Sequence, residues 1–371
     1  MGPLSISVEI SSDGGVKARS WRDGAAKRGQ QRVDLTGLDG RVLRVFERWL
    51  MDHDRVWDRE DIRVFGQLLH RRLFPDEVWT WIEKQIDERR DNLVRLQLSF
   101  PVDAASSRLA SLPWEFLCAP DRPGQDGRFL VLTPGLMLSR SVPPGTPERA
   151  TIDMDEVRIL PVVGDAHNDW LGPVDYQPVL DAITAAGERP DFTVLDAAVE
   201  VTEDELASAT ADQRPHVVHY IGHGRFSEQT AKGAIALRAA SGGTAWVDED
   251  NLAERLCTDE WAPTVVVLHA CEGGRNDYEY RHAGLAPGLV RQGVQCVVAM
   301  QYPVTNETAK AFSTALYEAL ADRQYLDEAV QTARARIWQA TKDARLLGVP
   351  MVYQRNAAPL LRGPHAKVGR R

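Results

Sequence analysis

The feature that most constrains the fold is a series of short apolar segments in the second half of the chain, separated by stretches with helical spacing. Short segments that are apolar almost throughout are typical of strands buried on both faces of a parallel sheet. The expected strands are 157–163, 192–198, 216–221, 265–269 and 296–300, and the expected helices are 179–186, 203–208, 252–256, 285–292, 305–322 and 325–342. This alternation predicts an α/β fold with a mostly parallel sheet sandwiched by helices.

The first half of the chain is less regular. The Gly-, Arg- and Gln-rich stretch after residue 10 is interpreted as a loop that extends to about residue 30. Apolar residues recur three and four positions apart around Phe46, Leu69 and Trp79, which predicts three helices. Four strands are expected, at 4–10, 93–100, 129–132 and 136–142.

The strongest run of chain-breaking residues separates the two halves. Residues 143–147 read PPGTP, and three prolines and a glycine in five positions continue neither a helix nor a central strand. We therefore expect two domains, an N-terminal half at 1–145 and an α/β domain at 146–371.

Composition narrows the class of protein. The hydrophobic fraction of 43% and the charged fraction of 26% are those of a globular chain, and the formal charge of -9 argues against direct binding to nucleic acid. No apolar run has the roughly 18 residues of a membrane helix, and the first residues lack the basic-then-apolar pattern of a signal peptide. The expectation is a cytoplasmic protein without a membrane partner and without a cofactor.

The four cysteines, Cys118, Cys257, Cys271 and Cys296, are far apart and have no C-x-x-C spacing. This spacing predicts neither a disulfide framework nor a cysteine-rich zinc site. A single cysteine in a special setting is then a candidate for catalysis.

Two reactive side chains follow expected strands directly. His223 stands between two glycines after the strand 216–221, and Cys271 stands before Glu-Gly-Gly after the strand 265–269. Parallel sheets bind their ligands beyond the carboxyl ends of the strands, so neighbouring strands would bring these two side chains together.

A histidine beside a cysteine can act as its base, because the thiolate is the nucleophilic form. His223 lies 48 residues before Cys271, close to the spacing of about 50 found in caspase-type enzymes. The backbone N–H groups of Gly224 and Cys271 are the natural donors of an oxyanion hole. The pattern predicts His223 and Cys271 as a catalytic pair.

Two other interpretations compete with this one. A buried cysteine at a strand end is often only a core residue, and a His-Gly pair is often only a turn. His216, His219, His223, His269 and Cys271 also have the side chains of zinc ligands. His216 and His219 are an odd number of positions apart, so they face opposite sides of a strand, which argues against a shared metal ion. No metal is expected.

Four segments together resemble the CHAT domain family of caspase-like peptidases, which belongs to the clan of separases, gingipains and metacaspases. They are 219–224 (HYIGHG), 266–273 (VVLHACEG), 285–304 and 112–117 (LPWEFL). The resemblance implies a caspase-like fold and peptide-bond cleavage through a thiol acyl-enzyme, with His223 as base and Cys271 as nucleophile. It also implies that the N-terminal half is a degenerate, catalytically empty caspase-like half, in which Trp114 and Glu115 are structural.

The resemblance places the substrate pocket in the loops after the first, fourth and fifth strands of the α/β domain. Those loops contain Asp165, His269, Gln301 and Tyr302. Asp165 could select a basic side chain by charge, or it could be an exposed turn residue. Caspases have a glutamine where this chain has His269, so selectivity for aspartate is not expected.

The partners are inferred from the same resemblance. A protein substrate is expected, in bacterial signalling, antiviral defence or regulated cell death. The chain shows none of the helical repeats that many family members use as sensors, so a separate activating protein is expected. The alternatives are a catalytically silent caspase-like scaffold and, less favoured, a zinc-dependent hydrolase.

Overall fold

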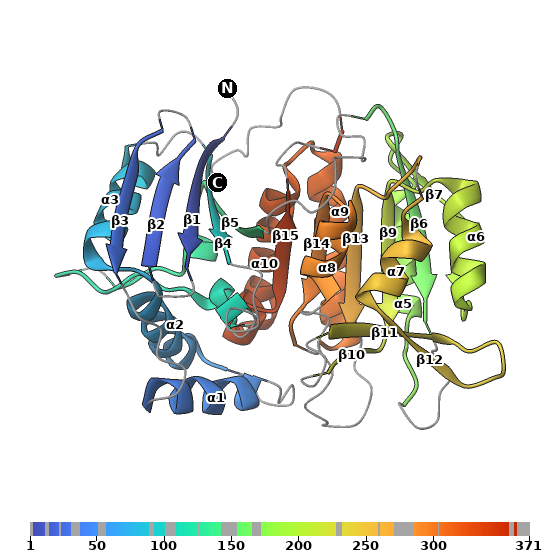
Figure 1. The fold of residues 1–371 in the computed structure, drawn as a ribbon, viewed down its shortest axis with the longest axis horizontal. Helices are drawn as coiled ribbons and strands as arrows, with labels where there is room; N and C mark the ends of the chain where they lie inside the picture. The colour runs from blue at the N-terminus through green and yellow to red at the C-terminus, as the bar shows by residue number, and fades with distance from the viewer. Residues whose placement is uncertain are drawn as a thin grey trace. The chain divides into compact units, whose positions relative to one another are not determined.

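The structure of the chain is a computed structural model (Figure 1). It describes residues 3–11, 15–21, 24–30, 38–50, 57–88, 93–100, 109–110, 112–124, 126–141, 154–164, 172–227, 232–258, 260–270, 285–302, 304–355 and 360–361. The chain forms two compact units. Unit 1 comprises Met1–Pro143 with Thr341–Met351, and unit 2 comprises Pro144–Ala340 with Val352–Arg371.

The sheet of unit 1 has the order β3-β2-β1-β4-β5. The first three strands pair antiparallel, whereas β1 pairs with β4 and β4 with β5 in parallel. The strands are β1 (Leu4–Ile10), β2 (Gly15–Ser20), β3 (Ala26–Gln30), β4 (Val94–Ser99) and β5 (Leu136–Ser141).

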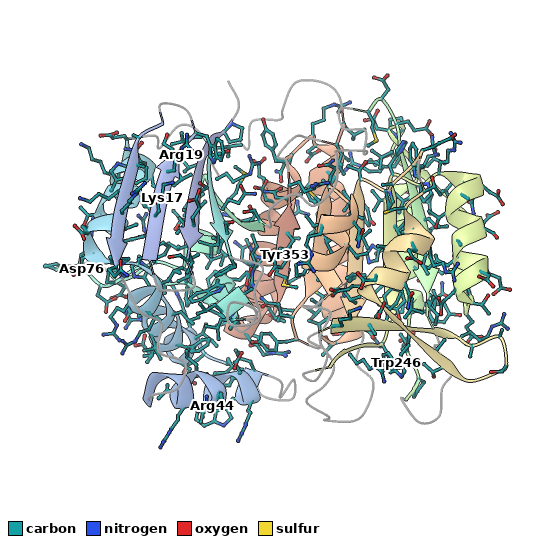
Figure 2. The ribbon with its side chains drawn as sticks, viewed as in Figure 1. Lys17, Arg19, Arg44, Asp76, Trp246 and Tyr353 are labelled. Carbon is teal, nitrogen blue, oxygen red and sulfur yellow. The ribbon has the colours of Figure 1, made fainter. Side chains whose placement is uncertain are left out.

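Two expectations for unit 1 were wrong. The expected loop after residue 10 contains β2 and β3. In β2, Val16 and Ala18 are buried while Lys17 and Arg19 lie on the half-buried face, so the buried positions are too few and too small to stand out in the sequence (Figure 2). The expected strand 129–132 is instead the 3₁₀ helix η2 (Leu130–Leu132), because a short buried apolar run fits either structure.

In the part of unit 1 that the structure describes, the α-helices are α1 (Leu38–Leu50), α2 (Arg59–Leu73) and α3 (Asp76–Asp87). Helix α2 begins where Asp58 accepts the N–H of Asp61 at 2.8 Å, which satisfies one of the free donors of a helix start. It packs against the 3₁₀ helix η1 (Trp114–Phe116).

Unit 2 contains the parallel sheet that the sequence predicts. Its order is β14-β13-β9-β6-β7, with β8 also paired to β6, and every one of these pairings is parallel. The strands are β6 (Val157–Val163), β7 (Phe192–Val194), β8 (Ala198–Val199), β9 (Val217–Gly222), β13 (Val265–Ala270) and β14 (Cys296–Met300). The expected single strand 192–198 is therefore divided into β7 and the start of β8.

Helices flank this sheet on both faces. Helix α5 packs against α9, while α7 packs against both α6 and α8. The helices are α5 (Gln177–Ala186), α6 (Glu203–Gln213), α7 (Glu249–Leu256), α8 (Leu285–Gln292), α9 (Asn306–Ala321) and α10 (Leu326–Thr341). In the described part of the chain no helix has both the length and the apolar character to cross a membrane.

A small antiparallel sheet follows β9 in the chain. It has the order β10-β11-β12, with β10 (Gly224–Ser227), β11 (Lys232–Arg238) and β12 (Thr244–Asp248). Neither this sheet nor β15 (Pro350–Gln354) was expected from the sequence, and the division between the units falls within β15. β9 ends at Gly222 and β10 begins at Gly224, so His223 is the single residue that connects these two strands and their sheets.

Candidate active site

The strands that precede His223 and Cys271 are direct neighbours. β9 and β13 pair in parallel from Val217↔Val265 to Gly222↔Ala270, so both end at the same edge of the sheet. The expected adjacency of these strands is thereby confirmed. Cys271 and Asp165 lie outside the described residues.

His223 is buried, with 3% of its surface exposed, and one ring nitrogen has a defined partner. Its Nε2 lies 3.0 Å from the carbonyl oxygen of Gly172. A carbonyl can only accept, so Nε2 carries the hydrogen and Nδ1 of the neutral ring carries the lone pair. The contact with Gly172 therefore makes Nδ1 the basic nitrogen.

Gly172 is a functional candidate that the sequence analysis missed. Its φ is +86°, a backbone conformation that glycine adopts without the steric cost borne by other residues. The signal available in the sequence is the Gly-Pro dipeptide at 172–173, which marks a turn but does not indicate what its carbonyl contacts.

The backbone around His223 is also held. Its carbonyl accepts the N–H of Ala236 at 3.0 Å and lies 2.9 Å from the hydroxyl of Tyr220. The sequence places Tyr220 in an expected strand and in the family segment 219–224, but it does not indicate this contact.

His269 lies at one end of a buried polar chain, with His219 in the middle and Tyr317 at the other end. The Tyr317 hydroxyl lies 2.8 Å from Nδ1 of His219, and Nε2 of His219 lies 3.4 Å from Nδ1 of His269. Both imidazoles are fully buried, and Nε2 of His269 has no hydrogen-bond partner among the described residues.

Burial keeps this chain of groups neutral. It lowers the pKa of His269 to about 4, lowers that of His219 well below its usual value, and raises the pKa of Tyr317. If Tyr317 donates to Nδ1 of His219, then His219 donates to Nδ1 of His269, and Nε2 of His269 is left as a donor.

Gln301 and Tyr302 follow β14 directly, at the carboxyl end of the strand beside β13, and both are buried. Their assignment to a substrate pocket, like that of His269 and Asp165, stays a prediction. Among the residues that the structure describes, no group of three or more His, Cys, Asp or Glu is placed to hold a metal ion.

In unit 1, Glu115 has a buried partner, Arg140. Its carboxylate accepts from Nε of Arg140 at 2.9 Å, and Arg140 also donates to the carbonyl of Leu112 at 2.9 Å. The indole of Trp114 is fully buried and donates to the carbonyl of Leu109 at 2.8 Å. These contacts give both residues a structural role.

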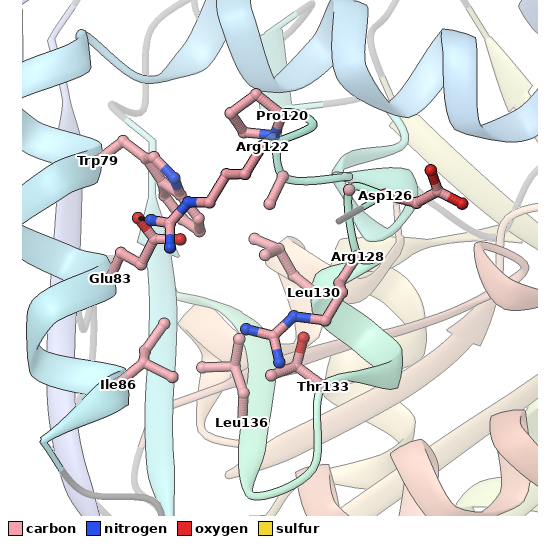
Figure 3. Close-up of a pocket in the computed structure, with 12 residues that line it drawn as sticks. Trp79, Glu83, Ile86, Pro120, Arg122, Asp126, Arg128, Leu130, Thr133 and Leu136 are labelled. Carbon is pink, nitrogen blue, oxygen red and sulfur yellow. Dashed lines mark hydrogen bonds and ion pairs between the residues drawn. The ribbon is translucent and has the colours of Figure 1, made fainter. Parts of the chain in front are cut away.

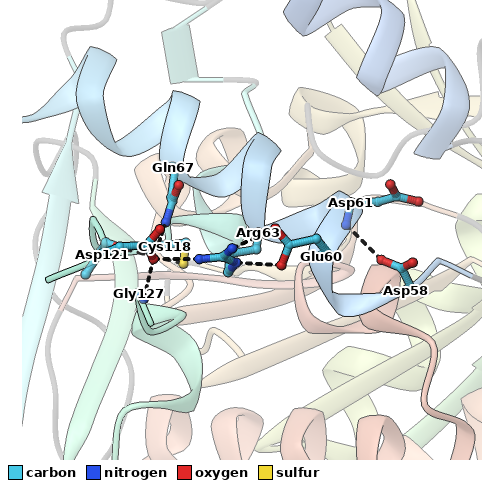
Figure 4. A network of polar contacts seen from close by, with 9 residues as sticks. Asp58, Glu60, Asp61, Arg63, Gln67, Cys118, Asp121 and Gly127 are labelled. Atoms are coloured by element: carbon cyan, nitrogen blue, oxygen red, sulfur yellow. Dashed lines mark hydrogen bonds and ion pairs between the residues drawn. The ribbon is translucent and has the colours of Figure 1, made fainter. Parts of the chain in front are cut away.

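Among the cysteines that the structure describes, Cys118 has the surroundings of an unreactive thiol. Cys118 is buried beneath a polar network in which Arg63 links Glu60 to Asp121, and burial raises the pKa of its thiol to about 12 (Figure 4). Cys296 is also buried, whereas Cys257 is half-buried. A thiol with a raised pKa is a poor nucleophile at neutral pH.

Among the described residues of unit 1, a hollow lies between α3 and the segment that leads to β5 (Figure 3). Its apolar lining includes Ile86, Leu130 and Leu136, and Arg122 forms an ion pair with Glu83 at its rim. None of the candidate catalytic or substrate-binding residues lines it.

Comparison with solved structures defines the class of fold. Separase from Saccharomyces cerevisiae, in its complex with securin, aligns with 95% of this chain at a TM-score of 0.51 and 13% identity. The chain spans 30% of that separase chain. The Arg-specific cysteine proteinase gingipain R aligns with 87% of this chain and 76% of its own, at 13% identity and a TM-score of 0.47. The likeness to separase and the parallel sheet flanked by helices define a caspase-like fold.

The family is shown by sequence. The model of the CHAT domain matches residues 64–361, which is most of the chain, so this chain belongs to the CHAT domain family. The expectation that the resemblance raised is confirmed. No curated protein matches the chain.

Proposed function

We propose that this chain is a cysteine endopeptidase that cleaves a protein partner, with His223 as general base and Cys271 as nucleophile. The observation that carries the proposal is the register of β9 and β13. The last pair is Gly222↔Ala270, and the residues that follow the two strands in the sequence are His223 and Cys271. A continuation of the same register by one position would set the imidazole and the thiol side by side.

The tautomer of His223 fits this role. Because Nε2–H donates to Gly172, Nδ1 can accept the proton of the Cys271 thiol. The thiolate then adds to the carbonyl carbon of the scissile peptide bond and forms a tetrahedral intermediate. Collapse of the intermediate breaks the C–N bond, and the proton on Nδ1 goes to the departing amine. Water hydrolyses the resulting thioester and restores the thiol.

Gly224 is proposed as an oxyanion donor together with Cys271. In the antiparallel ladder of β10 and β11, the N–H of Ala236 donates to the carbonyl of His223, which makes 223/236 a hydrogen-bonded pair. Hydrogen-bonded and non-hydrogen-bonded pairs alternate, so the N–H of Gly224 points away from β11. An amide in that position is available to a developing negative charge.

The substrate pocket is proposed to contain His269, Gln301, Tyr302 and Asp165. The buried Nε2–H of His269 fits a neutral acceptor, such as a carbonyl or a side-chain amide, because burial disfavours a charged imidazole. Asp165 is proposed to pair with a basic substrate side chain. The family points to an intracellular role in bacterial signalling, antiviral defence or cell death, with a separate activating protein.

The test uses iodoacetamide as a probe of the thiol and mass spectrometry to locate the modified cysteine. We expect Cys271 to react at pH 6 to 7, and the His223→Ala variant to require a higher pH. With a cleaved partner protein in hand, Cys271→Ala and Cys271→Ser should both abolish cleavage. Cleavage that survives in Cys271→Ala would rule out the thiol mechanism, and an unreactive Cys271 would favour the silent scaffold.

A further inference from the structure

The hydroxyl of Tyr220 has an unusual position for a residue in the middle of a central strand. The side chain is buried, with 2% exposed, and its oxygen lies 2.9 Å from the carbonyl of His223 and 2.9 Å from the carbonyl of Ala236. Both partners are acceptors, so the single hydrogen of the hydroxyl serves two carbonyls at the point where β9 gives way to β10.

Two glycines make room for this hydroxyl. A Cβ at Gly164, just after β6, or at Gly222, at the end of β9, would collide with the Tyr220 oxygen. The N–H of Gly164 also donates to the carbonyl of Ile221 at 3.0 Å, which joins the end of β6 to the end of β9. The phenol therefore fills a space bounded by the ends of two parallel strands and by β11.

We infer that Tyr220 is a positioning residue, whose hydroxyl fixes the backbone of His223 so that its imidazole stays in line with Cys271. The inference rests on the proposed function. It explains why one carbonyl receives both a ladder hydrogen bond and a side-chain hydroxyl. The ring of His223 is oriented at one end by Gly172, and its backbone is held at the other by Tyr220 and Ala236.

The physical consequence concerns geometry. A general base is effective only while its nitrogen remains within hydrogen-bond distance of the proton that it accepts. Loss of the Tyr220 hydroxyl leaves the His223 carbonyl with its ladder bond but lets the residue shift relative to β13. The effect should appear in the reactivity of the thiol rather than in substrate affinity.

The experiment compares Tyr220→Phe with the wild type in the rate of Cys271 alkylation by iodoacetamide between pH 5.5 and 9. We expect the rate at pH 6.5 to fall about tenfold, a barrier change typical of one mispositioned group, and the pH profile to move toward that of His223→Ala. The control is Thr210→Val. Thr210 is a buried residue of the same unit, and its hydroxyl donates to the carbonyl of Leu206 at 2.9 Å. It should keep the wild-type profile.

A second variant displaces the hydroxyl without removing it. In Gly222→Ala the new Cβ would meet only the far end of the Tyr220 side chain, so we expect a shift in the same direction as in Tyr220→Phe. If both changes act through the hydroxyl, the double variant should lose less than the product of the two single losses.

The outcomes separate the two proposals. A Tyr220→Phe profile equal to that of the wild type, or an equal shift in Thr210→Val, would overturn the positioning role. Independent, multiplicative losses in the double variant would overturn it as well. If His223→Ala itself leaves the wild-type profile unchanged, the His223–Cys271 pair is absent, and the proposed function fails first.

Discussion

At the scale of single residues, the carbonyl of Gly172 decides which nitrogen of His223 is basic. In Gly172→Ala, the alanine would have to adopt a φ of +86°. This backbone conformation costs L-residues about 1 to 2 kcal/mol. We expect the loop to relax, the contact with Nε2 to lengthen, and the rate of Cys271 alkylation at pH 6.5 to fall roughly tenfold. The measurement is the pH dependence of alkylation.

Gly24 offers a matched control. Its φ is +70°, and a Cβ there would have nothing within 4 Å, so Gly24→Ala has a similar backbone strain in unit 1 without touching the candidate site. It should lower the melting temperature slightly and leave alkylation unchanged. If the two variants behave alike, Gly172 has no specific role.

The buried pair of Glu115 and Arg140 gives a second prediction at this scale. Both side chains are at most 2% exposed, so Glu115→Ala leaves a buried guanidinium without its counter-charge. Loss of one partner of such a pair costs about 3 to 5 kcal/mol, whereas replacing both by apolar residues of similar volume costs far less. Urea unfolding should therefore rank Glu115→Ala below the double variant Glu115→Leu/Arg140→Met.

The exposed pair of Glu60 and Arg63 is the control for this measurement. The Glu60 carboxylate is largely solvated, so Glu60→Ala should change the unfolding midpoint only slightly. A Glu115→Ala variant no less stable than Glu60→Ala would contradict a structural role for the buried pair.

At the scale of elements, the contact between α2 and η1 depends on one glycine. A Cβ on Gly66 would collide with the carbonyl of Phe116 and lie 2.9 Å from Cβ of Cys118, while the Gly66 carbonyl accepts the N–H of Cys118 at 3.2 Å. We expect Gly66→Ala to destabilise unit 1 by about 1 to 3 kcal/mol through overpacking, although alanine is the better helix former. Urea unfolding monitored by tryptophan fluorescence measures this change.

Val64 serves as the comparison on the same helix. It is 53% exposed, so Val64→Ala removes little buried surface and should be nearly neutral. A Gly66→Ala variant as stable as the wild type would show that α2 can move away from η1 at no cost.

The elements that the sequence predicted share one property. β9 and β13 are apolar almost throughout because the sheet buries them on both faces, and that pattern can be read directly. β3 has alternately exposed residues and no apolar signal, and the short strands β10 and β12 depend on pairing with β11 rather than on their own composition. Such strands are defined by tertiary partners, which a single sequence does not display.

The features of the candidate site also divide into those that could be predicted from the sequence and those that could not. The positions of His223 and Cys271 after successive strands could be predicted, because strand ends are visible as the limits of apolar runs. The contacts of Gly172 and Tyr220 could not, since each is a backbone carbonyl or a hydroxyl that meets a residue through the folded chain. Residue types identify the chemistry, and the contacts that orient it appear only in three dimensions.

At the scale of the whole molecule, buried histidines in both units link stability to pH. Burial lowers the pKa of His70 in unit 1 to about 3 and that of His216 and His269 in unit 2 to about 4. These groups bind protons more weakly in the folded chain than in the unfolded chain, where the pKa is about 6.5. Stability is therefore complete above pH 6.5 and is lost as the pH falls toward 4.

His70 allows this linkage to be tested at one position. Its ring packs edge-on against Trp79 at 4.3 Å, and neither ring nitrogen has a hydrogen-bond partner among the described residues. In His70→Phe the unfolded chain has one proton fewer to bind. When the pH is lowered from 7.5 to 5, the free energy of unfolding should therefore fall by about 2 kcal/mol less in this variant than in the wild type. Urea unfolding at both pH values measures the difference. An unchanged pH dependence in His70→Phe would mean that His70 titrates normally in the folded chain.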